Sequence, residues 1–365
     1  MTGRYWRRPH FRFFILLAAT LALIVVACDV RFVPPPPGDE PTPPGTTRGW
    51  YEIFFTEPDC PPEQEREGGV DEIIAADLLR AQSQVDVAAF DLDAESIVDA
   101  LIELEEGGVA VRVVTDDQNE DQDGIRRLRR NGTGVVTDDR SALMHDKFIV
   151  VDGRVVWTGS LNYTSNGAYC NNNNAVRIES PLLARNYQAE MDEMYIDHDF
   201  GPLSPDATPL KQLRIGDVLI ENYFASEEDV ASLLANVVAE AESEILFMAY
   251  SFTQEDIGEA MLARAEQGVT LRGIFETTGS ETPFSYFPVM RDAGLSGVSV
   301  RQDGNPRLMH HKVIIVDRRV VVFGSFNFSG NANDSNDENV LIVHDPEFTS
   351  FFVEEFNLLW EEAGR

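Results

Sequence analysis

The sequence is poor in positive charge, and above all in lysine. Its 365 residues include 29 Lys and Arg against 62 Asp and Glu, which gives a formal net charge of −33. Only three residues are lysine: Lys147, Lys211 and Lys312. The one dense group of basic side chains lies within residues 126–130, so the chain offers little to a polyanion such as duplex DNA. The acidity has two interpretations, adaptation to high salt or a role in selecting substrate.

A hydrophobic run long enough for an ordinary membrane span is also missing. Residues 13–27 form the main apolar run, 15 residues long, whereas a spanning helix needs about 20. Four Arg and no acidic residue occur in residues 1–27, and Cys28 follows Val-Val-Ala. This pattern is typical of a bacterial lipoprotein signal peptide. We therefore expect lipidated Cys28 and an exported, membrane-anchored lipoprotein of the bacterial cell envelope; an uncleaved anchor is the alternative.

Cysteine is scarce as well. With Cys28 assigned to lipidation, only Cys60 and Cys170 remain. Outside the cytoplasm a disulfide between them would persist, but two free thiols fit the sequence equally well.

The remaining chain consists of a proline-rich segment and a long internal repeat. Residues 28–48 contain Pro34 to Pro37 and predict a stiff tether. Strands that alternate with helices follow in the same order twice, over residues 49–200 and 213–365, with a linker at 201–212. Buried strands are expected at 85–92 and 244–252, for example. This alternation predicts an α/β sandwich in each repeat.

Both repeats contain the pattern H-x-K-x4-D-x6-G-S-x-N. The first copy comprises His145, Lys147, Asp152, Gly159, Ser160 and Asn162; the second comprises His310, Lys312, Asp317, Gly324, Ser325 and Asn327. Residues two apart on a strand point to the same face, so each His is expected beside its Lys. The Gly-Ser-x-Asn segment should end the return strand of a hairpin. An imidazole, an ammonium, a hydroxyl and an amide then converge, a set that suits a phosphate group.

These motifs resemble those of the phospholipase D superfamily, and the resemblance covers about residues 50–362. It implies two repeats packed about a pseudo-twofold axis with one shared active site. One His attacks phosphorus and forms a phosphohistidine, and the other protonates the leaving alcohol. The Lys, Ser and Asn side chains of both motifs hold phosphate oxygens, and neither a metal nor a cofactor is required. The resemblance gives Asp152 and Asp317 a mainly structural role.

The two repeats differ at a position eleven residues after the motif Asn, where the family often has an acidic residue that hydrogen-bonds the catalytic His. Repeat 2 has Glu338 there, and repeat 1 has Asn173. Because a carboxylate favours imidazolium, we expect His145 to stay neutral as the nucleophile and His310, paired with Glu338, to be the acid. The opposite assignment has an argument too, since a carboxylate also strengthens a nucleophilic imidazole. Two aromatic residues at matching strand ends, Phe90 and Tyr250, are expected to be core residues rather than to line the site.

The favoured function is hydrolysis of phospholipid headgroup phosphodiesters by a membrane-anchored enzyme. The alternatives are an endonuclease of the same family and a phosphatidyl transferase of the cardiolipin synthase kind. A degenerate, non-catalytic scaffold would have a broken motif, whereas both copies are whole. The expected partners are a phospholipid or other phosphodiester and the membrane, with nucleic acid less favoured and no obligate protein partner evident.

Overall fold

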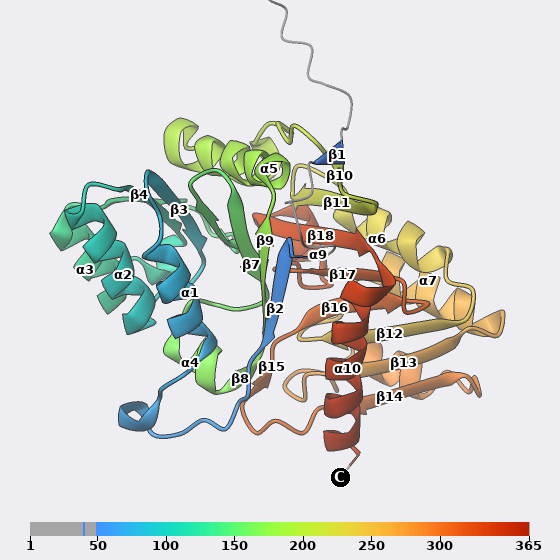
Figure 1. Cartoon of the computed structure of the whole chain (residues 1–365). Helices are drawn as coiled ribbons and strands as arrows, with labels where there is room; N and C mark the ends of the chain where they lie inside the picture. Colours follow the sequence, from blue (N-terminus) through green and yellow to red (C-terminus); the bar gives the residue numbers. More distant parts are fainter. Residues whose placement is uncertain (1–38, 41–48, 365) are drawn as a thin grey trace, which may run out of the picture. The chain divides into compact units, whose positions relative to one another are not determined.

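The computed structural model describes residues 39–40 and 49–364. The predicted signal peptide, Cys28 and nearly all of the tether lie outside these residues. The two repeats belong to one compact unit, and Figure 1 traces their elements from the blue start of repeat 1 to the red end of repeat 2.

Repeat 1 is a seven-stranded sheet with helices on both faces, and the strand order is β2-β9-β7-β6-β3-β4-β5. Strands β3, β4 and β5 are parallel, and the others pair antiparallel. The elements are β2 (Tyr51–Phe55), η1 (Glu63–Glu65), α1 (Val70–Leu78), β3 (Gln84–Ala89), α2 (Glu95–Glu106), β4 (Ala110–Thr115), η2 (Asp117–Asn119), α3 (Asp123–Asn131), β5 (Gly134–Thr137), β6 (Lys147–Val151), β7 (Val155–Gly159), α4 (Ser165–Tyr169), β8 (Asn171–Asn172), β9 (Asn174–Glu179), α5 (Pro181–Asp192), η3 (Glu193–Asp197) and η4 (Gly201–Leu203).

Repeat 2 has the same plan with two further strands at one edge, in the order β1-β10-β11-β18-β17-β16-β12-β13-β14. The added strand β1 (Asp39–Glu40) lies within the predicted tether and pairs parallel with β10. The elements that follow are β10 (Gln212–Ile215), β11 (Val218–Ala225), α6 (Val230–Ala239), β12 (Glu244–Ala249), α7 (Glu255–Glu266), β13 (Thr270–Phe275), α8 (Tyr286–Arg291), β14 (Val298–Gln302), β15 (Leu308–Met309), β16 (Lys312–Val316), β17 (Val320–Gly324), α9 (Gly330–Asp334), β18 (Glu338–His344) and α10 (Pro346–Glu362).

The repeated order of elements confirms the predicted α/β fold with two phospholipase D-like halves. Helices α1 and α2 cover the outer face of the first sheet, and α6 and α7 cover that of the second (Figure 1). The motif strands β6 and β16 are buried along their whole length, which explains their continuous apolar sequence. The His and Lys of each motif therefore lie at the start of a buried strand that is hydrogen-bonded to a neighbouring strand on either side.

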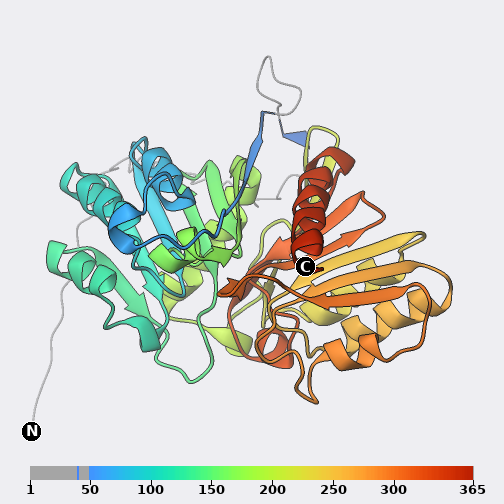
Figure 2. The ribbon, with the colours of Figure 1, turned by 90° about the horizontal axis from the view of Figure 1, so that it is seen from below.

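The two repeats share a hydrophobic core between their sheets. It contains Phe148 and Tyr187 from repeat 1 together with Leu246, Phe323 and Phe348 from repeat 2. Helices α5 and α10 contribute to it and begin in the same way. Ser180 Oγ accepts from Leu183 N at 3.0 Å, Asp345 Oδ1 accepts from Phe348 N at 2.7 Å, and a proline follows each cap. Figure 2, seen from below, shows the halves on either side of this region.

A two-stranded parallel sheet also links the halves. Strand β8 of repeat 1 pairs with β15 of repeat 2, with Asn171 opposite Leu308 and Asn172 opposite Met309. Both strands come immediately before site residues, Asn173 and His310. The pairing therefore fixes the two motifs relative to each other through the backbone.

Candidate active site

The two motif histidines lie where the repeats meet, and each is fixed by a backbone hydrogen bond to the other repeat. His145 N donates to the carbonyl of Asp337 at 2.9 Å, and His310 N donates to the carbonyl of Asn172 at 2.9 Å. Their side chains are only 5% and 6% exposed. The expected single site built from both motifs is therefore present in the structure.

Each motif lysine is buried beside its histidine, as the two-residue spacing on a strand predicts. Lys147 Nζ donates to the His145 carbonyl and Lys312 Nζ to the His310 carbonyl, both at 2.8 Å. Burial lowers the pKa of Lys147 to about 8, and burial together with Lys147 lowers the pKa of Lys312. Two desolvated amines side by side are a receptor for an anion, because a bound phosphate would restore the ammonium form of both.

The carboxylate of Glu338 crosses between the repeats and binds His145. Glu338 Oε2 lies 2.7 Å from His145 Nδ1, and it also accepts from Ser325 Oγ at 2.6 Å. The other oxygen accepts from Asn336 Nδ2 at 3.2 Å. Burial raises the pKa of Glu338 to about 7. Above that pH the Nδ1–H of His145 donates to a carboxylate, which leaves Nε2 as the ring nitrogen available to a substrate.

Asn173 occupies the corresponding place at His310. His310 Nδ1 lies 3.0 Å from Asn173 Oδ1 and 3.1 Å from the Ser160 carbonyl. Both neighbours are acceptors, so Nδ1 must carry a proton. The amide orientation follows from its own contacts, since Asn173 Nδ2 donates to the Gly167 carbonyl at 3.0 Å while Oδ1 accepts from Ser160 Oγ at 3.0 Å. His310 therefore has a neutral partner where His145 has a carboxylate.

The predicted pairing of Glu338 with His310, and of Asn173 with His145, was wrong. Each of these residues stands at the start of the last strand of its own sheet, next to the hydroxyl of its own Gly-Ser-x-Asn segment, but its side chain reaches the histidine of the other repeat. A spacing counted within one repeat identifies the partner residue and does not reveal this exchange. The exchange follows from the way in which the two repeats pack against each other around their shared core.

Burial governs the protonation of both histidines in the empty site. It lowers the pKa of His145, as do the nearby charges of Lys147 and Lys312. It also lowers the pKa of His310, with Lys312 and Lys147 acting in the same direction. Each lysine therefore acts on both histidines, as expected when the four groups surround one small volume. A negatively charged substrate would offset these positive charges and favour protonation of a histidine.

The Gly-Ser-x-Asn segments support the site rather than only line it. Ser160 Oγ accepts from Asn174 N at 3.1 Å, and Ser325 Oγ accepts from Asn339 N at 2.9 Å. Gly159 has φ +148°, and a Cβ there would lie 2.3 Å from the Asn174 carbonyl oxygen, so a larger residue would displace the serine. The side-chain oxygens of Asn162 and Asn327 are buried, and no hydrogen-bond partner for them occurs among the described residues. Each of these two amides therefore has an oxygen that the described part of the chain leaves unused, in addition to the free ring nitrogens and the amines of the motifs.

The motif aspartates, included among the candidate catalytic residues, lie at the far ends of the motif strands. Asp152 accepts from the backbone N–H groups of residues 82–84, at 2.8, 2.8 and 3.1 Å. Asp317 accepts from those of residues 242–244, at 2.8, 2.7 and 2.9 Å. Each carboxylate thus fixes the turn that enters β3 or β12. These contacts support the structural role that the resemblance implies, and a catalytic role for the two aspartates stays a prediction.

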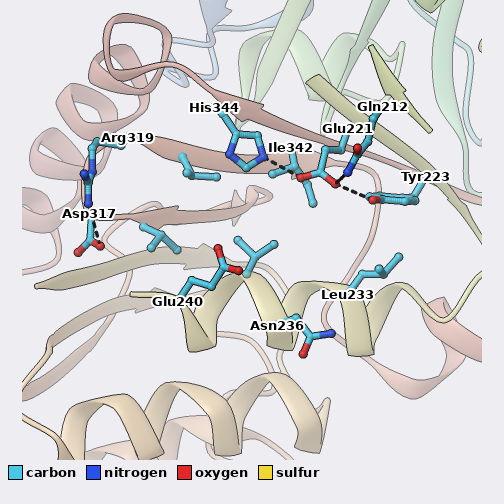
Figure 3. A pocket seen from close by; sticks show the side chains of 13 residues that line it. Gln212, Glu221, Tyr223, Leu233, Asn236, Glu240, Asp317, Arg319, Ile342 and His344 are labelled. Atoms are coloured by element: carbon cyan, nitrogen blue, oxygen red, sulfur yellow. Dashed lines mark hydrogen bonds and ion pairs between the residues drawn. The ribbon is translucent and has the colours of Figure 1, made fainter. Parts of the chain in front are cut away.

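Figure 3 shows Asp317 beside Arg319 in the wall of a pocket. This pocket is a cavity of about 370 Å³ that is lined by α6 and by β11 and β18, together with Glu221 and His344. His344 Nε2 and Glu221 Oε1 are 2.7 Å apart in its wall. None of the other motif residues lines this cavity. A second hollow, of about 320 Å³, is lined by Tyr250 and by residues of the loop at 276–285, and the Tyr250 ring contacts that of His310.

Two aromatic side chains that sequence reasoning assigned to the core belong to the site. The Phe90 ring is 5.0 Å from the His145 ring and 5.1 Å from Lys147 Nζ. The Tyr250 ring is 4.7 Å from the His310 ring and 4.7 Å from Lys312 Nζ. The expectation of simple core packing was therefore wrong. Their matching positions at the ends of β3 and β12 were the available signal.

The structure also bears on the cysteines and on the predicted membrane attachment. Cys60 and Cys170 form a disulfide with an S–S distance of 2.06 Å, which is one of the two alternatives that the sequence left open. Cys170 directly precedes β8, so the disulfide ties the segment before α1 to the strand that leads to Asn173. In the part of the chain that the structure describes, no helix is long and apolar enough to cross a bilayer. The lipidation of Cys28 and the leader lie outside the described residues.

Comparison with known families identifies the superfamily. A family model described as cardiolipin synthase, PLD-like domain, matches the chain twice, over residues 74–195 and 234–360. The chain belongs to the phospholipase D superfamily. Each match spans one motif with its sheet, in agreement with the two repeats of the structure.

Individual relatives match a smaller part of the chain. The mitochondrial cardiolipin hydrolase of Homo sapiens is 33% identical over 135 residues, which are 37% of this chain and 52% of that protein. A phospholipase D of Rickettsia felis is 29% identical over 155 residues, 42% of this chain and 76% of its own length. The match thus spans about half of the human protein's length.

Among solved structures, the phosphatidylserine synthase of Haemophilus influenzae matches 85% of this chain and 86% of its own. The TM-score is 0.64 and the sequence identity 14%. This likeness over both repeats supports the two-repeat fold alone.

Proposed function

We propose that the protein is a phosphodiesterase that hydrolyses phospholipid headgroup esters through a phosphohistidine on His145. The observation that carries this proposal is the unequal pairing of the two histidines, with Glu338 at 2.7 Å from His145 Nδ1 and the Asn173 amide at 3.0 Å from His310 Nδ1. An imidazole that keeps its Nδ1 proton becomes cationic when Nε2 is phosphorylated. A carboxylate on Nδ1–H stabilises that cation, and an amide does so much less.

The first chemical step forms the covalent intermediate. His145 Nε2 attacks phosphorus, the bond from phosphorus to the headgroup oxygen breaks, and protonated His310 gives its Nε2 proton to that oxygen. The buried Lys147 and Lys312 neutralise the non-bridging oxygens, and the Nδ2 groups of Asn162 and Asn327 would donate hydrogen bonds to them. The free headgroup alcohol leaves.

The second step restores the enzyme. Neutral His310 takes a proton from water, the water oxygen attacks phosphorus, and the bond from phosphorus to His145 Nε2 breaks. Phosphatidate leaves, while His310 is protonated again. His145 thus remains the proposed nucleophile, although the carboxylate and not the amide is its partner.

Several observations favour lipid over nucleic acid. The net charge is −33, and the arginines at 126–130 are all engaged with carboxylates: Arg126 and Arg130 with Asp123, Arg127 with Asp99, and Arg129 with Glu120. No free basic surface remains there to follow a nucleic acid backbone. The relatives include a cardiolipin hydrolase and a phospholipase D. A lipid anchor at Cys28 in the bacterial cell envelope would hold the site beside its substrate, and the disulfide suits that compartment.

Transfer of the phosphatidyl group to an alcohol is the second candidate, because the matching family model is described as cardiolipin synthase. The covalent step is the same, and an acceptor alcohol takes the place of water. Incubation with phospholipid and an excess of glycerol or phosphatidylglycerol separates the two. Hydrolysis gives phosphatidate throughout, whereas a transferase gives the new diester as its main product.

Substrate class is tested with the purified full chain on phosphatidylcholine, phosphatidylethanolamine, cardiolipin and single-stranded DNA in parallel, with His310→Ala as the control. Headgroup release from at least one lipid, lost in the control, is the expected result. Cleavage of DNA alone would overturn the lipid assignment. The anchor is tested separately, since Cys28→Ser should move the protein from the membrane fraction to the soluble fraction.

A further inference from the structure

The residue between His and Lys in each motif differs in charge between the repeats. In repeat 2 it is His311, which is fully buried and lies with Nε2 3.3 Å from Glu355 Oε1 of α10. In repeat 1 it is Asp146, and the residue 44 positions further on, which matches Glu355, is Glu190 of α5. In repeat 2 the imidazole of His311 can therefore donate to the buried carboxylate of Glu355. In repeat 1 the equivalent pair consists of two carboxylates.

The carboxylate of Asp146 has no hydrogen-bond partner in the part of the chain that the structure describes. The residue is 0% exposed, and both carboxylate oxygens are buried. Its side chain is on the face of β6 that α5 covers, because Phe148 two residues later lies on the same face and has its ring 4.9 Å from that of Tyr187. Glu190 is three residues beyond Tyr187 on α5, so it follows on the same side of the helix.

Two further carboxylates lie beside Glu190. Oxygen atoms of Glu190, Glu193 and Glu227 lie within 4.8 Å of one another. Glu190 and Glu193 are 3% and 5% exposed. Glu227 comes from the other repeat, directly after β11, and its Oε1 is buried with no partner in the described part of the chain. The carboxylate of Glu193 accepts a hydrogen bond from Ser204 Oγ at 2.9 Å.

Two basic side chains of this region are already paired with other carboxylates. Lys211 Nζ lies 2.6 Å from Glu228 and 2.5 Å from Asp206, and Arg140 Nη2 lies 2.5 Å from Asp337. Burial raises the pKa of Glu190, and the carboxylates of Glu227 and Asp146 raise it further, which places the four groups within electrostatic range. Buried carboxylates without a compensating charge are strongly unfavourable.

We propose that Glu190, Glu193 and Glu227 bind one divalent cation of the oxygen-preferring class, such as Ca²⁺, whose charge also compensates the unpartnered carboxylate of Asp146. All the donor atoms are carboxylate oxygens, which suit Ca²⁺ or Mg²⁺ and not the softer transition metals. Three carboxylates that each bind through both oxygens can supply six of the six to eight ligands that Ca²⁺ takes. The ion would be structural, because Asp146 and α5 lie on the face of β6 opposite to that of His145 and Lys147.

Such an ion would join the two repeats. Glu190 and Glu193 belong to repeat 1, and Glu227 belongs to repeat 2. The catalytic histidines depend on the same contact between the repeats, since the Nδ1 partner of each histidine belongs to the other repeat. The cation therefore stabilises the arrangement that assembles the site, and its binding is independent of which phosphodiester is the substrate.

The test is thermal unfolding of the purified full chain after treatment with a chelator, followed by titration with CaCl₂ or MgCl₂ at constant ionic strength set with NaCl. Constant ionic strength matters because screening alone stabilises so acidic a protein. We expect Tm to rise with the logarithm of the ion concentration above Kd, by about 5 °C at a hundredfold excess over Kd. Isothermal titration calorimetry should give one ion per chain. Tm values that neither ion changes would overturn the proposal.

Matched variants separate binding from general stability. Glu190→Gln with Glu227→Gln removes two ligands and their mutual repulsion, so the chelated double variant should be at least as stable as the chelated parent chain but should gain nothing from Ca²⁺. Glu355→Gln, the equivalent change in repeat 2, should leave the Ca²⁺ response intact whatever its effect on basal Tm. A double variant that still gains the full rise in Tm would contradict the assignment of these residues.

Discussion

The two repeats have nearly the same strands, motifs and caps, yet they treat their histidines differently. His145 has the buried carboxylate of Glu338 at Nδ1, and His310 has the amide of Asn173. The residue between the His and the Lys of each motif also differs: it is Asp146 in repeat 1 and His311 in repeat 2. Both repeats supply an imidazole and an amine to the site. The different residues at Nδ1 give the two imidazoles different chemical roles.

The partner of each histidine comes from the other repeat. Because each partner crosses to the opposite repeat, a change in the sequence of repeat 2 alters the chemistry of the repeat 1 histidine. Neither half contains a complete histidine with its partner. The shared core and the β8–β15 pairing, which fix the halves together, are therefore as necessary to the site as the motifs themselves.

Replacing the two histidines should give the largest effects and should separate their roles. His310→Ala is expected to lower kcat on phospholipid by about 10²–10⁴-fold, the usual contribution of a general acid. With a nitrophenyl phosphodiester, whose leaving group needs no proton, it should still release about one equivalent of nitrophenol in a burst. His145→Ala should give no burst with either substrate. A burst from His145→Ala would exchange the two roles.

Removing the charge of Glu338 should give the next largest effect. Glu338→Gln keeps the shape but loses a charge-assisted hydrogen bond, so kcat/KM should fall by about 10²-fold, equivalent to about 3 kcal/mol. Since the pKa of Glu338 is about 7, activity of the parent chain should rise as the pH increases through that value, when the carboxylate forms. The variant should lose this rise.

Asn173→Asp is the matched change at the other histidine. A carboxylate there would raise the pKa of His310 and so extend the activity to higher pH, with a smaller loss at neutral pH than Glu338→Gln causes. Complete pH profiles of both variants provide the comparison. Equal profiles would mean that the asymmetry of the partners has no catalytic consequence.

The motif aspartates should affect stability and leave the chemistry unchanged. Asp317→Ala removes an acceptor from three backbone N–H groups and should destabilise the fold by about 2 kcal/mol in urea unfolding. The hydrogen bonds lower the pKa of Asp317 to about 2, so its contribution is complete above the unfolded pKa of 3.8 and is lost as the pH falls through 2. The kcat of the folded variant should stay within about twofold; a much larger loss would restore Asp317 to the catalytic groups.

The aromatic neighbours should give the smallest effect. Phe90→Leu removes the ring beside His145 and Lys147, and the lost cation–π contact of about 1 kcal/mol corresponds to about a fivefold lower kcat/KM. Phe54→Leu is the control, since the Phe54 ring stacks on Trp157 at 5.5 Å and packs in the core under α1 and α2, on the other side of the sheet from the shared core. Similar losses in both variants would indicate general loosening of the core.

Much of this architecture could be predicted from the sequence, because it depends on local patterns that occur twice. The motif strands, the position of His145 beside Lys147 and the two-repeat α/β fold follow from period-two burial and from the repeat itself. The family assignment, made from the motif residues, is confirmed by the family model. Glu338 and Asn173 were also identified as partner residues.

What could not be predicted depends on contacts across the interface between the repeats. The exchange of Glu338 and Asn173 is set by how two sheets pack, which no spacing within a repeat encodes. Phe90 and Tyr250 look like core aromatics until the neighbouring lysines are located. The sequence does not single out Asp146. Its importance depends on the carboxylates of Glu190 and Glu227, which are distant from it in sequence.

The central claim is that the carboxylate-bound histidine is the nucleophile. Rapid acid-free quenching of the His310→Ala variant with a radiolabelled phospholipid or nitrophenyl diester, followed by peptide mapping by mass spectrometry, locates the covalent adduct. The account predicts a phosphoryl adduct on His145 alone, and greatly reduced adduct formation when Glu338→Gln is added. Because His310 is absent from that variant, the parent chain is quenched in parallel, and an adduct on His310 there would contradict the account.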